Sequence, residues 1–270
     1  MPGCVGESRS RPSRHRWWRW GRALLDALLP LRCSACGAWL DAVVETGHAA
    51  QDPLARVLCT DCRAALRLID GPICPRCGLP FASGEGSDHL CGACLAHAPA
   101  YAMARSAGIY GPPLKTLIHR LKYDGQLRVA RPLGDMLWGA FLRGWGDRSV
   151  DLIIPVPLHR RRLRERGFNQ VRAMMRSWPC LDRKPRSTSI DGGVLVRARH
   201  TASQAGLDRK ERQRNMRAAF RVDRPAAVIG RSVLIVDDVM TTGATVAACA
   251  EALKSSGARR VDVLTLARAL

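Results

Sequence analysis

The fold of this 270-residue sequence is decided by one stretch, Ser232-Val233-Leu234-Ile235-Val236-Asp237-Asp238-Val239-Met240-Thr241-Thr242-Gly243-Ala244-Thr245. Residues Val233 to Val236 are apolar without alternation, which is typical of a parallel strand buried on both faces. Ligands of open parallel α/β sheets bind beyond the carboxyl ends of the strands. The stretch therefore predicts an α/β fold in which the polar residues after Val236 form part of a ligand site.

A hydroxyl-rich turn follows the two carboxylates, and a helix is predicted from Gly243 to Ser256. Gly243 permits a close backbone approach, and the start of a helix offers N–H groups and a positive dipole end to an anion. This combination suits a phosphate attached to a sugar. The residues that we expect to form this part of the site are Val236, Asp237, Asp238, Thr241, Thr242, Gly243, Ala244 and Thr245.

The rest of the α/β pattern begins after residue 100, with strands predicted at 103–110, 151–154 and 261–267 and helices at 112–124 and 133–142. A loop with two prolines follows the strand at 151–154, and prolines that bracket a single residue stiffen a loop. Because it stands at the ligand-facing end of a strand, we expect this loop to form a second anion site. Its residues are Pro155, Val156, Pro157, Leu158 and His159.

Eight of the eleven cysteines form four Cys-x-x-Cys pairs between residues 33 and 94. Each pair offers two thiolates to a tetrahedral Zn²⁺, and two pairs complete a closed structural site, so the pattern predicts two zinc ions. The spacing favours consecutive pairing, although a cross-braced pairing also fits. The favoured sets are Cys33, Cys36, Cys59 and Cys62 for one ion and Cys74, Cys77, Cys91 and Cys94 for the other.

The composition predicts three regions: a basic disordered tail at 1–22, a double zinc ribbon at 23–99 and the α/β domain at 100–270. The net charge is +20, and residues 158–221 carry 18 Lys and Arg against five Asp and Glu, which favours an anionic partner. No apolar run reaches the roughly 20 residues that span a bilayer. Paired cysteines without a secretory leader favour the reducing cytoplasm.

At this point a family resemblance is visible. The stretch Ile235 to Thr245 resembles the signature of type I phosphoribosyltransferases, which bind phosphoribosyl pyrophosphate (PRPP), and residues 21–268 are similar to the ComF family of competence and amidophosphoribosyltransferase-like proteins. Three further features carry the resemblance: the paired cysteines, the Pro155 to His159 loop followed by Arg166-Gly167-Phe168-Asn169-Gln170, and Thr201-x-x-Gln204-x-x-Leu207 followed by Arg212, Asn215 and Ala219-Phe220.

The resemblance implies a type I phosphoribosyltransferase-like parallel sheet with helices on both faces, preceded by the double zinc ribbon. By it, Asp237 and Asp238 would hold the ribose hydroxyls directly or through Mg²⁺, the turn up to Thr245 would wrap the 5′-phosphate, and the proline loop would face the pyrophosphate. Residues 197–215 would form a mobile hood. The residues with a catalytic role would then be Asp237, Asp238, Lys210 and Arg212.

Two functions follow from the resemblance. The first is transfer of a phosphoribosyl group from PRPP to an acceptor that the sequence does not name. The second is a non-catalytic role in DNA uptake for natural transformation, with single-stranded DNA and a competence helicase or uptake machinery as partners. Because the chain is only 5% aromatic, we expect any single-strand binding to be modest, sequence-independent and sensitive to salt.

Overall fold

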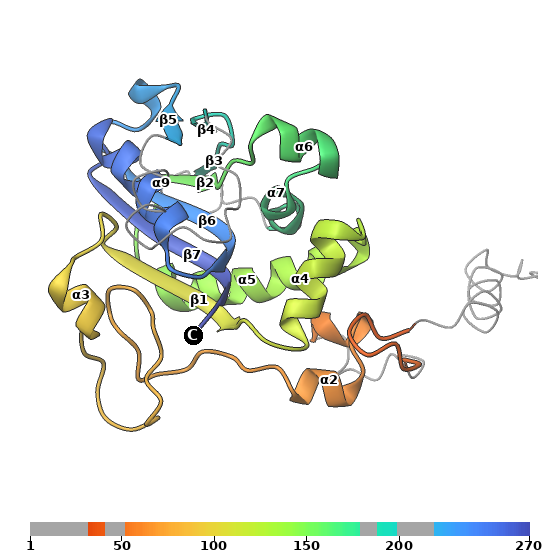
Figure 1. The fold of residues 1–270 in the computed structure, drawn as a ribbon. Helices are drawn as coiled ribbons and strands as arrows, with labels where there is room; N and C mark the ends of the chain where they lie inside the picture. Colours follow the sequence, from red (N-terminus) through yellow and green to blue (C-terminus); the bar gives the residue numbers. More distant parts are fainter. Residues whose placement is uncertain (1–31, 41–51, 179–187, 199–218) are drawn as a thin grey trace, which may run out of the picture.

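The computed structural model describes residues 32–40, 52–178, 188–198 and 219–270. At its centre lies a parallel sheet of five strands in the order β1-β7-β6-β2-β3 (Figure 1). The strands are β1 (Met103–Ile109), β2 (Leu152–Pro155), β3 (Ser189–Ile190), β6 (Ser232–Met240) and β7 (Arg260–Arg268). A separate antiparallel pair consists of β4 (Leu195–Arg197) and β5 (Phe220–Val222). The predicted parallel α/β sheet is therefore confirmed.

The central strand β6 is longer than the sequence predicted. It does not end at Val236 but continues through both aspartates to Met240, because Val239 and Met240 still pair with Ala267 and Arg268 of β7. On its other side β6 pairs with β2, up to Val236 opposite Pro155. The strand therefore carries the acidic residues within the sheet and delivers the turn at the carboxyl edge.

Helices cover both faces of the sheet, as predicted. Leu234 of β6 belongs to a core shared with α4 (Leu114–Tyr123) and α5 (Ala130–Trp145), whereas Ile235 belongs to a core shared with α9 (Ala244–Ser255). This alternation follows from the strand period of two. The remaining elements of this domain are η2 (Leu127–Val129), α6 (Arg160–Arg166), α7 (Gln170–Met175) and η4 (Pro225–Ala227).

The cysteine pairs lie in two small units beneath the sheet. The first unit contains η1 (Pro53–Arg56) and α2 (Thr60–Ala64) and lies on the side of α4, while the second contains α3 (Gly92–Ala96) and lies beside β1 (Figure 1). The predicted tail at 1–22 falls outside the described residues. In the part of the chain that the structure describes, none of the helices combines the length and the apolar character needed to cross a membrane.

Candidate functional site

The two carboxylates at the end of β6 are both buried, with Asp237 9% and Asp238 5% exposed. The Oδ1 atom of Asp238 accepts a hydrogen bond from Nζ of Lys122 at 2.8 Å, and its Oδ2 accepts one from Nε2 of Gln170 at 2.5 Å. The backbone N–H of Asp238 donates to Oδ1 of Asp237 at 2.9 Å. Asp238 is therefore held by side chains from two helices, α4 and α7.

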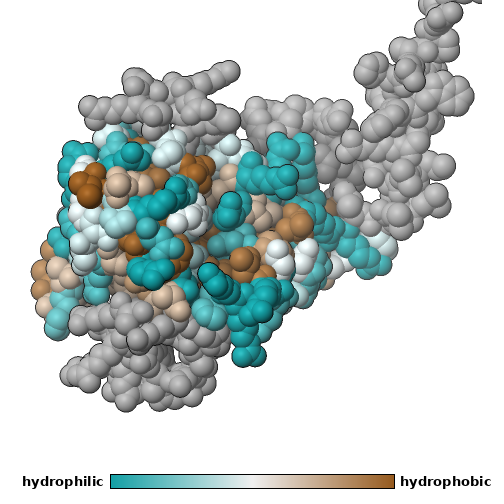
Figure 2. Space-filling model, turned by 90° about the horizontal axis from the view of Figure 1, so that it is seen from above, coloured by the Kyte–Doolittle hydropathy of each residue, from teal (hydrophilic) through white to brown (hydrophobic). Residues whose placement is uncertain are grey.

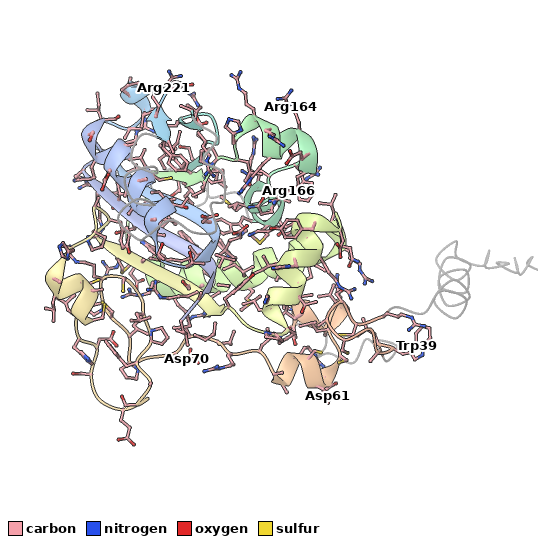
Figure 3. The ribbon with its side chains drawn as sticks, viewed as in Figure 1. Trp39, Asp61, Asp70, Arg164, Arg166 and Arg221 are labelled. Carbon is pink, nitrogen blue, oxygen red and sulfur yellow. The ribbon has the colours of Figure 1, made fainter. Side chains whose placement is uncertain are left out.

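Gln170 is itself held in place by a second basic residue. Arg166 donates from Nη1 to the Oε1 of Gln170, and its guanidinium lies 5.6 Å from the centre of the Tyr123 ring. Figure 3 shows Arg164 on the outer side of α6, whereas Arg166 lies nearer to α4 and α7. Because Arg166 occupies the amide oxygen, the amide nitrogen of Gln170 is the atom that faces Asp238.

Asp237 lies in a different environment from its neighbour. Its burial, and next the charge of Asp238, raise the pKa of Asp237 to about 7. Consecutive side chains of a strand point to opposite faces of the sheet. In agreement with this, burial and next the charge of Asp237 raise the pKa of the buried Cys249 of α9. The two carboxylates therefore leave β6 on opposite faces, although the charge of Asp238 still acts on Asp237.

The predicted phosphate turn connects β6 to α9. Thr241 and Thr242 are exposed, and Gly243 has a φ of 78°, in the left-handed region that favours glycine. The Oγ1 of Thr242 accepts a hydrogen bond from the backbone N–H of Ala244 at 3.4 Å. Ala244 and Thr245 are the first residues of α9, so the turn presents hydroxyls at the positive end of a helix of 12 residues.

The structure places the proline loop next to β6, the strand that leads into this turn. The backbone N–H of Val156 donates to the carbonyl oxygen of Val236 at 2.8 Å, which extends the pairing of β2 with β6 into the loop. Nδ2 of Asn169 donates to the Val156 carbonyl at 3.0 Å. At the end of the loop His159 caps α6, because its Nδ1 accepts from the N–H of Arg161. Both predicted halves of the site therefore lie at the carboxyl edge of adjacent strands.

A cleft of about 1250 Å³ opens next to the proline loop. Pro155, Pro157, Leu158 and His159 line it, but the two aspartates and the turn after them do not. Seen from above, the described surface is mostly hydrophilic with small hydrophobic areas between (Figure 2). Among the described residues that line the cleft, Asp223 is the only acid. The arginines that line it are Arg131, Arg160, Arg172, Arg176, Arg197 and Arg221.

Sequence reasoning missed the partners of the acidic residues. Lys122 is 116 residues from Asp238 in the sequence and lies in the last turn of an amphipathic helix, so no local signal marks it. Gln170 stood in one of the quoted motifs, but without a role. Lys210 and Arg212, which the sequence analysis placed in a hood, lie outside the described residues.

The donor set of the acidic residues does not fit a directly coordinated Mg²⁺. Both oxygens of Asp238 already accept hydrogen bonds, one of them from an ammonium group, and Asp237 is buried with a raised pKa. Mg²⁺ requires near-ideal octahedral geometry and dehydrates reluctantly. The carboxylates thus lack the convergent free oxygens that this ion needs.

The cysteines form two four-sulfur clusters, and the pairing is consecutive. Within each cluster the Sγ atoms lie within 4.8 Å of one another. Cys36 Sγ and Cys59 Sγ are 3.7 Å apart, and Cys77 Sγ and Cys91 Sγ are 3.6 Å apart. A tetrahedral Zn²⁺ with Zn–S bonds of about 2.3 Å requires an S–S separation of about 3.8 Å. Both clusters therefore fit a closed structural zinc site, and the cross-braced alternative is wrong.

The first cysteine of each cluster has a lowered pKa, which favours its thiolate form. Burial raises the pKa of Cys33, but backbone N–H groups, foremost those of Cys36 and Cys59, outweigh it and lower the pKa to about 6. Cys74 shows the same balance, with a pKa lowered to about 6 against the effect of burial. Because zinc binds the thiolate form, these N–H groups favour metal binding.

Comparison with known proteins agrees with this geometry. A double zinc ribbon domain model matches residues 24–95, and a phosphoribosyl transferase domain model matches residues 190–270. The DNA utilization protein YhgH of Escherichia coli O157:H7 is 38% identical over 221 residues, which cover 79% of this chain and 91% of that protein. The chain belongs to the ComF family.

Two further ComF relatives carry names from competence. Competence protein F of Haemophilus influenzae is 31% identical over 225 residues, covering 78% of this chain and 96% of that protein. Competence protein ComFC of Bacillus subtilis is 26% identical over 218 residues, covering 78% of this chain and 84% of that protein. The predicted family and the double zinc ribbon are confirmed by these matches.

In this ComF chain Arg268 of β7 joins the second cysteine cluster to Met240, the last residue of β6 before the predicted phosphate turn. The guanidinium of Arg268 is buried and donates from Nη1 to the Cys77 carbonyl at 2.9 Å and to the Met240 sulfur at 3.1 Å, while Nη2 lies 3.8 Å from Cys77 Sγ. A Cβ atom added to Gly243 would lie 2.8 Å from Cε of the same Met240. One arginine therefore contacts a zinc ligand and the residue that packs under the turn.

Proposed function

We propose that the chain binds PRPP or a related ribose phosphate at the carboxyl edge of β6 and β2, and that it transfers the phosphoribosyl group to an acceptor. In this proposal Asp237 and Asp238 hold the ribose hydroxyls, the Thr241 to Thr245 turn holds the 5′-phosphate, and the Pro155 to His159 loop faces the pyrophosphate. Lys210 and Arg212 would neutralise the leaving group from a hood.

One observation carries the proposal. Two buried carboxylates and a hydroxylated turn at the start of α9 stand beside a stiff loop on the neighbouring strand. This is the edge at which parallel α/β sheets bind phosphorylated ligands. The match of a phosphoribosyl transferase domain model over residues 190–270 supports the same ligand class.

Mg²⁺ enters the proposal as an ion carried by the pyrophosphate of PRPP, because the carboxylates do not fit it. Mg²⁺ commonly stays bound to phosphate oxygens and water rather than to an all-protein cage. The two zinc ions, in contrast, have structural roles. We also propose the division into a tail at 1–22, a ribbon module at 23–99 and a transferase-like domain at 100–270, and a cytoplasmic location.

The test is a calorimetric titration of the zinc-loaded chain with PRPP in the presence of Mg²⁺. We expect the wild type to bind and the double variant Asp237→Asn/Asp238→Asn to lose most of the affinity. The reason is that an amide accepts hydrogen bonds from the ribose hydroxyls less strongly than a carboxylate does. Asp223→Asn, which changes an exposed acid of the cleft, is the matched control. Equal binding by wild type and double variant would remove the ligand assignment, and pyrophosphate release in the presence of candidate acceptors tests turnover.

A second candidate function is non-catalytic binding of single-stranded DNA during uptake, alongside a competence helicase or uptake machinery. It is favoured by the arginines of the cleft and by the names of relatives called competence and DNA utilization proteins. The affinity for a labelled single strand, measured by fluorescence anisotropy, should fall steeply between low and high salt. An affinity independent of salt would exclude this role.

Two arginines, one in α7 and one just after it, allow a finer measurement of the salt dependence. Replacing Arg172 and Arg176 by Gln should reduce the slope of log affinity against log salt by about 1.4, since each single-strand phosphate contact contributes about 0.7. Arg231→Gln, an exposed arginine that does not line the cleft, is the control and should leave the slope unchanged.

A further inference from the structure

We propose that Lys122 is the built-in cation of the ribose site, so that Asp238 binds the hydroxyls of a ribose 5-phosphate with no metal ion on the carboxylates. This deepens the proposed function and rests on it. It assigns a specificity-determining role to a residue of α4, a helix that contributes nothing to the predicted motifs.

The position of Lys122 is fixed by the packing of its helix. Leu117, Ile118 and Leu121 of α4 are buried in the core, which leaves Lys122 at the edge of the sheet with its ammonium group 2.8 Å from Oδ1 of Asp238. The side chains of Lys122 and Asp238 are only 17% and 7% exposed. An ion pair so far removed from water is screened little by salt and persists over a wide range of ionic strength.

The geometry leaves room for hydroxyl donors but not for a divalent cation. An ionised carboxylate offers about four lone-pair positions, and Lys122 and Gln170 occupy one on each oxygen of Asp238. Each oxygen therefore retains a position for a ribose hydroxyl. A divalent ion at the same oxygen would stand close to the ammonium group, and this repulsion opposes its binding.

The surrounding charges maintain this arrangement. Arg166 holds Gln170 with its amide nitrogen toward Asp238, so a second donor remains directed at the carboxylate. Asp237, the other carboxylate nearby, lies on the opposite side of the strand. The local balance is then the Lys122 ammonium directly on Asp238 and the Arg166 guanidinium beyond Gln170, so the charge of Asp238 is compensated without a metal.

The experiment is a calorimetric titration of the full-length, zinc-loaded chain with ribose 5-phosphate, which lacks the pyrophosphate that carries Mg²⁺. The wild type should bind with the same affinity, within about twofold, with and without Mg²⁺. Lys122→Met should weaken binding without Mg²⁺ by about 10- to 100-fold, the range typical of losing a hydrogen bond to a charged group. Mg²⁺ should restore part of that loss.

The matched control is Lys115→Met, which changes an exposed lysine of the same helix and should bind like the wild type. Lys122→Arg keeps the charge and should retain metal-free binding. If Lys122 had only a structural role, Lys122→Met would instead lose thermal stability and zinc content along with ligand affinity. The proposal is overturned if the wild type needs Mg²⁺ to bind, or if Lys122→Met binds like Lys115→Met.

A ligand-free measurement separates this inference from the proposed function. In a titration with Mn²⁺ followed by electron paramagnetic resonance, the wild type should take up no Mn²⁺ at the acidic residues. Uptake of one ion that Asp238→Asn abolishes would overturn the role of Lys122 even if no sugar phosphate binds. Absence of uptake supports it, and failure of both PRPP and ribose 5-phosphate to bind would then count against the proposed function alone.

Discussion

The two four-cysteine clusters have the same ligands but different surroundings. In the first cluster only Cys33 is buried, Cys36 is exposed, and nearby Trp39 is 55% exposed with Arg32 stacked 3.7 Å from its ring centre. All four cysteines of the second cluster are buried. Figure 3 shows Trp39 and Asp61 of the first unit at the edge of the molecule, away from the sheet.

The difference lies in how much of each cluster the core covers, because only Cys33 of the first cluster belongs to the buried core, whereas all four cysteines of the second do. The backbone of the second unit bonds directly to β1, since the N–H of Ala104 donates to the carbonyl oxygen of Arg76 at 2.7 Å. A Cβ atom added to Gly78 would lie 2.5 Å from the Ala104 carbonyl oxygen, so only glycine allows this approach. Together with Arg268, these contacts make the second zinc site continuous with the edge of the sheet that carries the proposed ligand site.

The largest expected effect separates the two clusters. Cys77→Ser should lower the free energy of unfolding by about 3–5 kcal/mol, because the buried guanidinium of Arg268 loses the zinc-bound thiolate as its charge partner. It should also abolish PRPP binding. Cys36→Ser, at the exposed cluster, should remove zinc from its own site and leave ligand binding intact. Thermal unfolding, zinc analysis and calorimetry measure these outcomes, and equal effects of the two substitutions would contradict the comparison.

A smaller effect is expected at the arginine that joins the second cluster to the turn. Arg268→Met should cost about 2 kcal/mol of stability, since the Cys77 carbonyl loses a charged donor. Ligand affinity and zinc affinity at the second site should both fall. Arg231→Met, an exposed arginine just before β6, serves as the control in chemical denaturation. A loss of stability with unchanged ligand affinity would show that the link does not reach the turn.

A substitution in the turn tests the same link from the other end, by its effect on zinc binding. Gly243→Ala places a side chain at a φ of 78°, which costs about 1–2 kcal/mol, and displaces Met240 from beneath the turn. Because Met240 accepts from Arg268, zinc should leave the second cluster more readily, while the first is unaffected. The rate of zinc transfer to a chromogenic chelator resolves two phases, and acceleration of both or neither would argue against the coupling.

The last expected effect concerns pH, and it is small over any narrow pH interval. The pKa of Asp237 is 3.8 in the unfolded chain and is raised by burial to about 7 in the folded chain. Between these two pH values only the folded chain holds the proton. Stability from this group is therefore lost as the pH rises from about 4 to 7. Asp237→Asn should gain stability relative to the wild type over this window by at most about 1.4 kcal/mol per pH unit. Denaturant unfolding at several pH values measures it.

This pH dependence also bears on the comparison of the clusters. The burial of Asp237 depends on the packing of β6 against α9, which the second cluster supports through Met240. The difference between Asp237→Asn and wild type should therefore persist in a Cys36→Ser background and shrink in a Cys77→Ser background. The opposite pattern would place the support for the acidic residue at the first cluster.

Local patterns in the sequence predicted β1, β2, β6 and β7, the turn and the cysteine pairs, because each depends on neighbours a few residues apart, but not the short strands β3, β4 and β5. Gly243 is an example, since its φ follows from the turn that the motif requires. The partners of Asp238 and Cys77 were not predictable, because Lys122 and Arg268 reach them from 116 and 191 residues away. Such contacts are created by tertiary packing, and no periodicity or motif spacing in the sequence predicts which single basic residue will be buried.

The contact between Arg268 and Cys77 also has a consequence for biosynthesis. The second cluster is made early on the ribosome, but the arginine that supports it follows 191 residues later. At about 5–20 residues per second this interval lasts roughly 10–40 s. During that time the nascent ribbon has its cysteines but neither the sheet nor the cation that later surrounds them. Its thiolates are therefore most open to oxidation or to a wrong metal before the last strand is complete.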